Sequence, residues 1–264
     1  MFGGILKIKL LEKNKEEVRL LIEDITPALA NALRRIMISE VPTLAIEWVE
    51  IHENTSALFN EMIAHRLGLI PLKFDPKKFN FMDECECGGK GCPLCTVVFA
   101  IDKTGPCIVY SKDMKSSNKE VSPISGDFPI VKLLEGQRIK LEAIAKLGIG
   151  KEHAKWQAAN ASYQFVPEID LKNVKDIDKI LEVSPKGIFK KVNNKLVIVD
   201  PYRYDEYKFV EELTGQIKVT LNTNKVVFNI ESVSGLSPGY IFKKAIEILE
   251  NKANEFKLEL EKIE

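Results

Sequence analysis

Four cysteines in one short loop have the type and the spacing of a metal site. Cys85 and Cys87 form one close pair, and Cys92 and Cys95 form a second pair beyond a glycine-rich turn. Two such pairs can place four thiolates around one tetrahedral ion, and zinc takes sets of four cysteines in closed structural sites. The spacing therefore predicts one structural zinc in the cysteine loop, residues 83–96.

Two other interpretations of these cysteines stay open. The thiols could pair as disulfides or remain free, because the cytosol of some hyperthermophiles tolerates disulfides. An iron–sulfur cluster is the remaining interpretation, although the spacing matches neither common ferredoxin pattern. The fifth cysteine, Cys107, begins an apolar run and is expected to be a small buried hydrophobic residue rather than a ligand.

The sequence shows no pattern of residues for catalysis. Its three histidines are each expected to have a hydrogen-bonding or surface role. It contains no Gly-x-Ser-x-Gly elbow, no Walker-type phosphate loop and no His-Glu-x-x-His helix. It also lacks an Asp-x-Asp cluster, which would hold two magnesium ions for nucleotidyl transfer. We therefore expect no catalytic residues in this chain.

Composition narrows the class of protein further. The chain has 264 residues, of which 45% are hydrophobic and 29% are charged, as in ordinary globular proteins. Lys+Arg and Asp+Glu both number 38, whereas a protein that grips nucleic acid needs a cationic surplus or a basic face. Neither a signal peptide nor an apolar run of about 18–20 residues is apparent. We expect a cytoplasmic protein without direct specific DNA binding and without membrane contact.

Short strands are expected at both ends of the chain. Residues 5–10 and 18–22 have strand-like patterns on either side of a turn, and residues 44–51 have another. Near the C-terminus, residues 216–221 and 226–230 predict a pair of strands. The turn-prone Asn222, Thr223 and Asn224 lie between them.

Three helices are expected, each with recognisable ends. In the first, Thr26 is the N-cap, Pro27 takes the first helical position and Val41-Pro42 ends the helix. In the second, Asn60 is the N-cap and Gly68 closes the helix in a left-handed conformation. Ser237 and Pro238 begin the third helix in the same way, and its apolar seam could run for about 26 residues, or about 39 Å.

Five phrases of this sequence resemble a known family. They are residues 31–36, 39–42, 64–72, 148–156 and 228–232. As a set they resemble the assembly subunits of cellular RNA polymerases: the N-terminal domain of the bacterial alpha subunit and, more closely, the D-type subunit of archaeal RNA polymerase. The resemblance implies a non-catalytic scaffold subunit of a DNA-directed RNA polymerase, which is a nucleotidyltransferase.

The resemblance supports a discontinuous fold of the α+β class, which the similar patterns at the two chain ends also suggest. Residues 1–49 plus 213–264 would form the dimerisation domain, and residues 50–212 would form an inserted, mostly-β domain. The partner implied is a small L-type subunit that forms a heterodimer with this chain. The pair would then recruit the large catalytic subunits and the small assembly subunits.

The apolar stripe of the last helix is longer than a domain of this size easily covers. One interpretation is that the chain itself covers the whole stripe. The other is that part of it packs on the partner, together with the first helix, and that one of the paired arginines binds a carboxylate of a large subunit. The residues expected at the partner interface are Leu29, Leu33, Arg34, Arg35, Ile36, Met37, Ile241, Ala245, Ile248, Leu249, Phe256 and Leu260.

Two further features of the sequence carry expectations of their own. The loop of residues 148–156 is expected to contact a large subunit as well, with Trp156 as an apolar anchor. Residues 168–209 resemble a degenerate ferredoxin-like module, with Ser184 where a cluster ligand would stand. No cysteine follows Cys107, so no iron–sulfur cluster is predicted there. The alternative is that residues 168–209 form a few strands with no ferredoxin ancestry.

Two other functions are alternatives to the scaffold role. A ferredoxin-like redox or metal-binding protein is suggested by the module and weakened by its missing cysteines. A zinc-knuckle nucleic-acid binder is suggested by the cysteine loop and weakened by the zero net charge.

Overall fold

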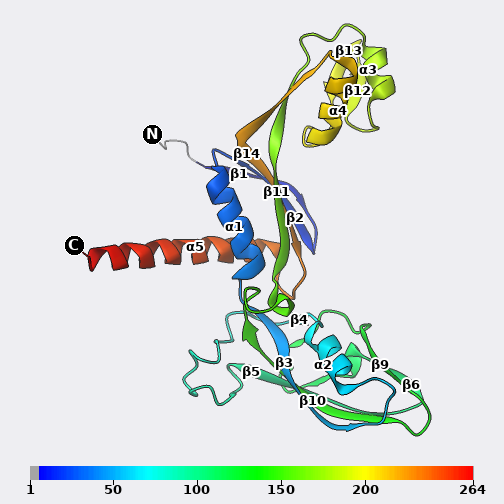
Figure 1. Cartoon of the computed structure of the whole chain (residues 1–264), viewed down its shortest axis with the longest axis vertical. Helices are drawn as coiled ribbons and strands as arrows, with labels where there is room; N and C mark the ends of the chain where they lie inside the picture. Colours follow the sequence, from blue (N-terminus) through cyan, green and yellow to red (C-terminus); the bar gives the residue numbers. More distant parts are fainter. Residues whose placement is uncertain (1–5, 264) are drawn as a thin grey trace. The chain divides into compact units, whose positions relative to one another are not determined.

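The computed structural model describes residues 6–263, which form a mixed α/β structure with several small sheets (Figure 1). Within that range the α-helices are α1 (Pro27–Ser39), α2 (Asn60–Gly68), α3 (Ile177–Val183), α4 (Tyr204–Thr214) and α5 (Pro238–Glu261), with 3-10 turns η1 (Ser111–Asp113) and η2 (Ala154–Trp156). No helix in these residues is long and apolar enough to cross a membrane.

The strands of the described chain are short, apart from four of eleven residues or more. They are β1 (Lys7–Lys13), β2 (Glu17–Glu23), β3 (Thr43–Asn54), β4 (Leu72–Lys73), β5 (Thr96–Thr104), β6 (Cys107–Tyr110), β7 (Lys115–Ser116), β8 (Ser122–Pro123), β9 (Pro129–Leu133), β10 (Arg138–Gly148), β11 (Ala159–Asp170), β12 (Phe189–Val192), β13 (Lys195–Ile198) and β14 (Lys218–Ser232).

The described residues divide into two compact units. The first unit holds residues 6–14, 18–32 and 162–229, and the second holds residues 15–17, 33–161 and 230–263. The predicted division into a dimerisation domain (1–49 plus 213–264) and an inserted domain (50–212) stays a prediction.

The first unit is built on a four-stranded sheet in the order β1-β2-β14-β11. Strands from both ends of the chain therefore meet in one sheet, as the similar patterns at the two ends suggested. Along β2, Val18, Leu20 and Ile22 are buried while the residues between them are half-buried. The predicted N-terminal hairpin is confirmed by the antiparallel pairing of β1 with β2; Ile5, with which the prediction began, lies outside the described residues.

The predicted strand pair at residues 216–230 is wrong. The structure has one continuous strand, β14, through the expected turn. Asn222 donates from Nδ2 to Glu168 Oε1 on β11 at 2.8 Å, and the carbonyl of Asn224 accepts from the Ile25 backbone at 3.2 Å. The Asn222 side-chain oxygen still accepts from the Asn224 backbone at 3.0 Å, but the long-range hydrogen bonds hold both residues in the strand.

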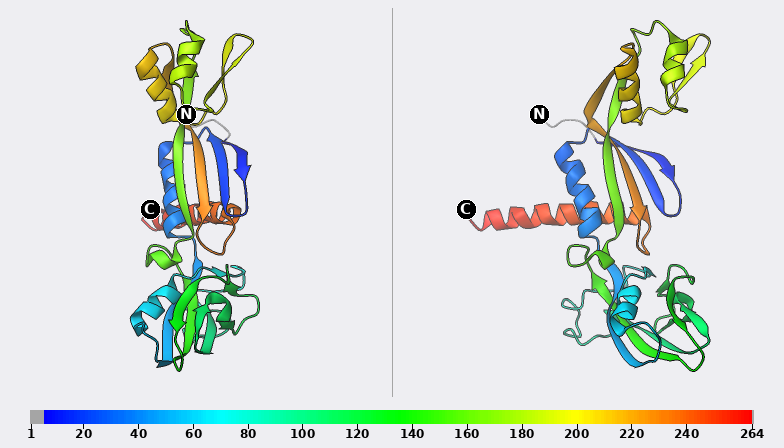
Figure 2. Two further views of the ribbon diagram at one scale, coloured as in Figure 1. Left: turned by 90° about the vertical axis from the view of Figure 1, so that its right-hand side faces the viewer. Right: turned by 45° about the vertical axis from the view of Figure 1, so that its right-hand side comes forward.

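A small module of α3, β12, β13 and α4 lies between β11 and β14 in the chain and in the first unit (Figure 2). Its core is a cluster of buried side chains around Tyr207, whose ring meets that of Phe189 edge-on at 5.2 Å. The other buried members of the cluster are Ile180, Ile188, Val210, Ile217 and Val219.

The second unit is built on an antiparallel sheet in the order β3-β10-β5-β7. Along β10 every second residue from Ile139 to Leu147 is buried, so one face of the sheet belongs to the core. Helix α2 packs on β3 and inserts Ile63 and Leu67, both 0% exposed. Arg66 of this helix donates to the carbonyl of Ile130 at 2.8 Å.

The first and last helices each start directly after the predicted capping residue. The Thr26 hydroxyl accepts a hydrogen bond from the Leu29 backbone at 3.3 Å, and the Ser237 hydroxyl accepts one from the Tyr240 backbone at the same distance. Pro27 and Pro238 occupy the first helical positions, where a missing N–H costs nothing. The predicted starts of α1 and α5 are therefore confirmed.

The predicted ends of α2 are wrong. Asn60 is the first helical residue, and its side-chain oxygen accepts from Asn54 instead of capping the helix. Gly68 is the last helical residue, and Leu69 after it stays right-handed, with φ −91° and ψ −3°. The Leu69 and Ile70 backbones bond to Arg66 and Leu67 in a tightened last turn, so no left-handed glycine is needed.

Candidate metal centre and partner surface

The cysteine loop brings four sulfur atoms together. The backbone of Cys95 bonds back to the Cys92 carbonyl at 3.0 Å, which closes one turn, and Gly88 adopts a φ of 63° that favours glycine. The Sγ atoms of Cys85 and Cys92 lie 3.5 Å apart. Those of Cys87 and Cys95 lie 3.7 Å apart, and those of Cys92 and Cys95 lie 3.8 Å apart.

These distances fit one tetrahedral ion. Sulfurs bound to zinc at about 2.3 Å in a tetrahedron lie about 3.8 Å from one another, whereas the S–S distance of a disulfide is about 2.0 Å. All four ligand atoms lie within 4.8 Å of one another, and all are free thiols in the structure. The four thiol donors and the distances between their sulfur atoms therefore fit a Zn²⁺ ion without rearrangement of the loop.

The four thiols are chemically unequal. A hydrogen bond from the Cys92 backbone lowers the pKa of the Cys87 thiol to about 6. Burial raises the pKa of the Cys95 thiol to about 12. Cys107 lies outside the cluster and is half-buried rather than buried, with its sulfur 3.6 Å from the Thr104 carbonyl.

The residues predicted for the partner interface fall into three groups by exposure. The chain itself buries Leu33, Ile36, Met37, Ile241 and Ala245. Leu29, Arg34, Ile248 and Leu249 are half-buried, and Arg35, Phe256 and Leu260 are exposed. Contact with a partner stays a prediction for all of these residues.

The exposed apolar side chains of α5 gather in its second half. Phe256 is 66% exposed, Leu260 47% and Ile263, just beyond the helix, 81%. At spacings of four and three residues these three side chains lie on one face. Leu258, 58% exposed, points to the opposite face.

A groove of about 310 Å³ lies at the C-terminal end of α1. Its lining includes Arg34, Arg35 and Lys151, with the carboxylate of Glu40 as the acidic member. Lys151 is held there because its backbone donates to the Ser39 carbonyl at 2.8 Å. The paired arginines and a residue of the 148–156 loop, far apart in sequence, thus share one basic surface.

The structure does not support the expectation that Trp156 is an apolar anchor for a subunit contact. Its side chain is 3% exposed, and its indole N–H donates to the Lys146 carbonyl at 3.3 Å. A Cβ on Gly148 would lie 2.4 Å from the Trp156 ring, so the missing side chain of Gly148 makes room for it. Trp156 packs in its own chain.

The sequence did not single out a second cluster of possible ligands. Glu50 and His52 on β3 and Glu142 on β10 have their ligand atoms within 4.8 Å of one another, and all three are exposed. The alternation of Glu50 and His52 along a strand could have signalled one shared face. The pairing with Glu142 depends on the register of two strands far apart in sequence.

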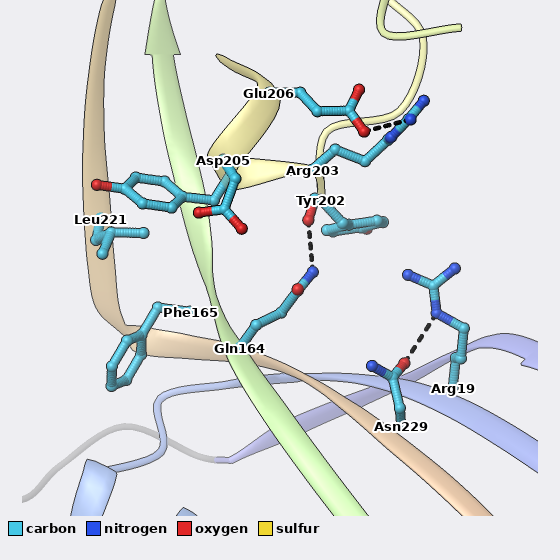
Figure 3. Close-up of a pocket in the computed structure, with 10 residues that line it drawn as sticks. Arg19, Gln164, Phe165, Tyr202, Arg203, Asp205, Glu206, Leu221 and Asn229 are labelled. Carbon is cyan, nitrogen blue, oxygen red and sulfur yellow. Dashed lines mark hydrogen bonds and ion pairs between the residues drawn. The ribbon is translucent and has the colours of Figure 1, made fainter. Parts of the chain in front are cut away.

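A pocket of about 470 Å³ lies in the first unit beside the small module (Figure 3). Figure 3 shows Gln164 reaching from β11 to the Tyr202 carbonyl at 2.5 Å, and Arg203 paired with Glu206. Arg19 donates from Nε to Asn229 at 3.0 Å. The lining has both charge signs and mostly satisfied polar groups, which gives it no evident preference for one ligand. Ser184, at the expected lost ligand position, donates to the Ile180 carbonyl at 2.5 Å.

Comparison with known proteins identifies the class. Residues 49–170 match the family described as RNA polymerase Rpb3/RpoA insert domain. This match covers the middle of the chain and points to the alpha-like subunits of RNA polymerase.

Relatives match nearly the whole length of the chain. DNA-directed RNA polymerase subunit Rpo3 of Archaeoglobus fulgidus is 35% identical over 261 residues, which cover 98% of this chain and 99% of the relative. The Rpo3 subunits of Methanopyrus kandleri (97% and 97%) and Pyrococcus horikoshii (98% and 99%) are both 38% identical. The chain belongs to the Rpo3 family of DNA-directed RNA polymerase subunits. The resemblance to the alpha-like family is thereby confirmed.

Proposed function

We propose that this chain is the D-type assembly platform of an archaeal DNA-directed RNA polymerase, and that it pairs with a small L-type subunit. As an Rpo3-family member it is a subunit of a nucleotidyltransferase and has no catalytic role of its own. The pair recruits the large catalytic subunits and small assembly subunits. Transcription in archaea places the complex in the cytoplasm.

The second half of α5 carries this proposal. All described side chains from residue 251 to residue 263 are exposed. An isolated helical segment of this length is marginal in water, because helices gain most of their stability from packing an apolar face. A stripe of Phe256, Leu260 and Ile263 on such a segment is best stabilised by a second polypeptide. Obligate interfaces of this kind commonly bury on the order of 2,000 Å² or more.

The proposed dimerisation domain comprises residues 1–49 plus 213–264, with residues 50–212 as the insert. Its support is the sheet in which β2 lies between β1 and β14. The half-buried Ile248 and Leu249 continue the exposed stripe toward the buried start of α5.

The basic groove is proposed as a contact with a large subunit. Arg35 is exposed, and Arg34 and Lys151 line the same groove. An arginine can bind a carboxylate through two parallel hydrogen bonds, which fixes orientation as well as charge. We assign this groove to an acidic side chain of a large subunit and not to DNA.

One structural zinc is proposed in the cysteine loop, held by Cys85, Cys87, Cys92 and Cys95. The sulfur separations support it. Bound zinc would supply a closed cross-link of the loop, with no open position for a substrate. Disulfide pairing is the competing outcome, which metal analysis of the purified chain distinguishes.

The small module is proposed to be ferredoxin-like in ancestry and to work without an iron–sulfur cluster. Its core is filled by Tyr207 and its neighbours, and the sequence has no cysteine after Cys107. Thiolates are the normal ligands of such clusters, and Ser184 is a poor replacement. The module would therefore have a structural role that depends on its shape.

Co-expression with the L-type subunit tests the proposal. The pair should co-purify as a one-to-one heterodimer, and the double variant Phe256→Asp/Leu260→Asp should lose it. Leu258→Asp is the matched control, because this equally exposed leucine lies on the opposite face. A wild-type chain that stays a stable monomer and forms no complex on mixing would refute the scaffold role.

A further inference from the structure

The sheet of the second unit has an open face that subunit pairing through α5 does not explain. On β10 the residues that alternate with the buried ones are Lys140, Glu142, Ile144 and Lys146, all exposed or half-buried. The neighbouring strands present side chains on the same face according to the register. The outer sheet face, as we call it, comprises Trp48, Glu50, His52, Val98, Ala100, Lys140, Glu142, Ile144 and Lys146.

An apolar row crosses the outer sheet face over three strands. Ile144 on β10 lies directly opposite Trp48 on β3 and Val98 on β5. Ile144 and Val98 are half-buried, and Trp48 is 44% exposed. A tryptophan is costly to leave in water because of its large apolar area, and it is among the residues most enriched at interface hot spots.

The exposed indole is held in place by charged neighbours. Lys146 Nζ lies 5.0 Å from the centroid of the Trp48 ring and 3.7 Å from a carboxylate oxygen of Glu47. Glu47 in turn pairs with Lys155. The ring is therefore positioned before any partner arrives, which reduces the entropy lost on binding.

Beside the apolar row lies a pair of acidic residues that forms no ion pair with Lys140, the nearest lysine along β10 on this face. Glu50 and Glu142 are directly opposite one another in the register, an arrangement of like charges that destabilises a sheet. His52 lies at a register shift in β3, with Nε2 3.9 Å from Glu142. Within residues 6–263, no lysine or arginine forms an ion pair with either glutamate. A cation from outside the described chain would relieve this repulsion.

We propose that the outer sheet face is a docking surface for another polymerase subunit, through a segment that carries a lysine or arginine next to a large apolar side chain. The cation would sit between Glu50 and Glu142, and the apolar side chain would cover Trp48. This inference rests on the proposed function, since it takes the partner from the same assembly. A metal ion on the glutamates would satisfy the charge but leave the apolar row in water, so the apolar row and the acidic pair together favour a protein segment.

Hydroxyl-radical footprinting of the two tryptophans tests the proposal. Trp48 is 44% exposed and Trp156 is 3% exposed in the chain alone, so Trp156 is an internal control. In the assembled polymerase the oxidation rate of Trp48 should fall about fivefold or more relative to the free full-length chain, as for a desolvated hot spot. Trp156 should be oxidised slowly in both. Equal oxidation of Trp48 in both states would overturn the docking surface.

Charge reversal supplies a second, independent measurement. A tagged Glu50→Lys/Glu142→Arg chain, co-expressed with the untagged wild type, should enter purified polymerase about tenfold less often, because like charges would then face the partner's cation. Glu135→Lys is the control, since Glu135 is exposed in the turn before β10. Thermal melting of the free chains confirms that each variant folds. Equal incorporation of both variants would overturn the proposal.

The remaining outcomes are also decisive. Trp48 that becomes protected in the free chain as its concentration rises would assign the face to a second copy. A Mn²⁺ or Zn²⁺ titration that protects Trp48 in the free chain would assign it to a metal, and either result overturns a subunit contact. If the chain enters polymerase with Trp48 still oxidised freely, this inference fails and the assembly role stands. If the chain does not enter polymerase at all, both fail.

Discussion

Lys252 of α5 forms an ion pair with Glu40, the residue that follows α1, with 2.5 Å between Nζ and Oε2. Ile241 and Ala245, earlier in the helix, are fully buried. Every described side chain from residue 251 onward is exposed. Exposed ion pairs contribute at most about 1 kcal/mol, so the support that the chain gives to α5 ends at this point.

Hydrogen exchange should reveal this division of α5. In the free chain, we expect the amides of residues 254–263 to exchange on the order of 100-fold faster than those around the buried Ile241 and Ala245, because the distal helix has no packed face. Addition of the L-type subunit should slow the distal amides. Equal protection of both halves in the free chain would show that α5 needs no partner.

Substitution of single cysteines should distinguish the four predicted metal ligands from the fifth cysteine, Cys107. The purified wild-type chain should carry one zinc, and Cys92→Ser should lose it, because a closed site needs all four sulfurs. Cys107→Ser should keep it, since Cys107 lies outside the cluster. Elemental analysis with native mass spectrometry makes the measurement. A metal-free wild type whose mass lacks the thiol hydrogens would establish disulfides instead.

The features that sequence predicted well are local ones. A hydroxyl at Thr26 or Ser237 caps a helix through atoms three residues away, so neighbouring residues decide the outcome. The same holds for the four cysteines, which lie within one short loop and need only a turn to meet.

The features that sequence missed depend on contacts between distant segments. Asn222 and Asn224 favour a turn, but partners on other segments keep them in a strand. Trp156 is buried because Gly148 makes room for its ring, a contact that the sequence of the loop does not reveal. The pairing of Glu50 with Glu142 follows from a strand register, which a single sequence does not fix.

Tyr207→Phe should weaken the small module. The Tyr207 hydroxyl is within hydrogen-bonding distance of two backbone carbonyls, that of Asp200 at 2.5 Å and that of Ile188 at 3.1 Å, and the side chain is fully buried. The Ile188 carbonyl also accepts from the Val199 backbone at 2.8 Å, so loss of the hydroxyl removes the donor of the Asp200 carbonyl, and the free energy of unfolding should fall by about 1–3 kcal/mol. Tyr204→Phe is the control, because Tyr204 packs only at the edge of the cluster. Urea denaturation measures the free energy of unfolding of both variants. Equal losses of stability would show that the Tyr207 hydroxyl contributes no more than that of Tyr204.

The same tyrosine predicts how stability changes in alkali. Burial raises the pKa of Tyr207 to about 12, above the usual value of about 10 in an unfolded chain. The unfolded state therefore loses this proton first as the pH rises, and the stability due to the buried neutral phenol falls between about pH 10 and pH 12. The difference in unfolding free energy between wild type and Tyr207→Phe should shrink over that range. A difference that is constant with pH would mean that the phenol titrates normally.

Gly150 should tolerate no side chain, because it lies against the end of α1. A Cβ at this position would be 2.4 Å from the Ile38 carbonyl oxygen and 3.2 Å from the Ser39 Cα, both backbone atoms that cannot rotate away. Gly150→Ala should therefore lower the free energy of unfolding by about 1–3 kcal/mol, as overpacking does. Gly239→Ala is the matched control: nothing lies within 4 Å of its Cβ position, and alanine in a helix should be neutral or stabilise it by up to about 1 kcal/mol. Since Lys151 is held by the Ser39 carbonyl, a displaced Gly150 should also disturb the basic groove. The variant should then bind the large subunits less well even at temperatures where it is fully folded. Unchanged binding would show that the groove does not depend on the close approach of Gly150 to α1.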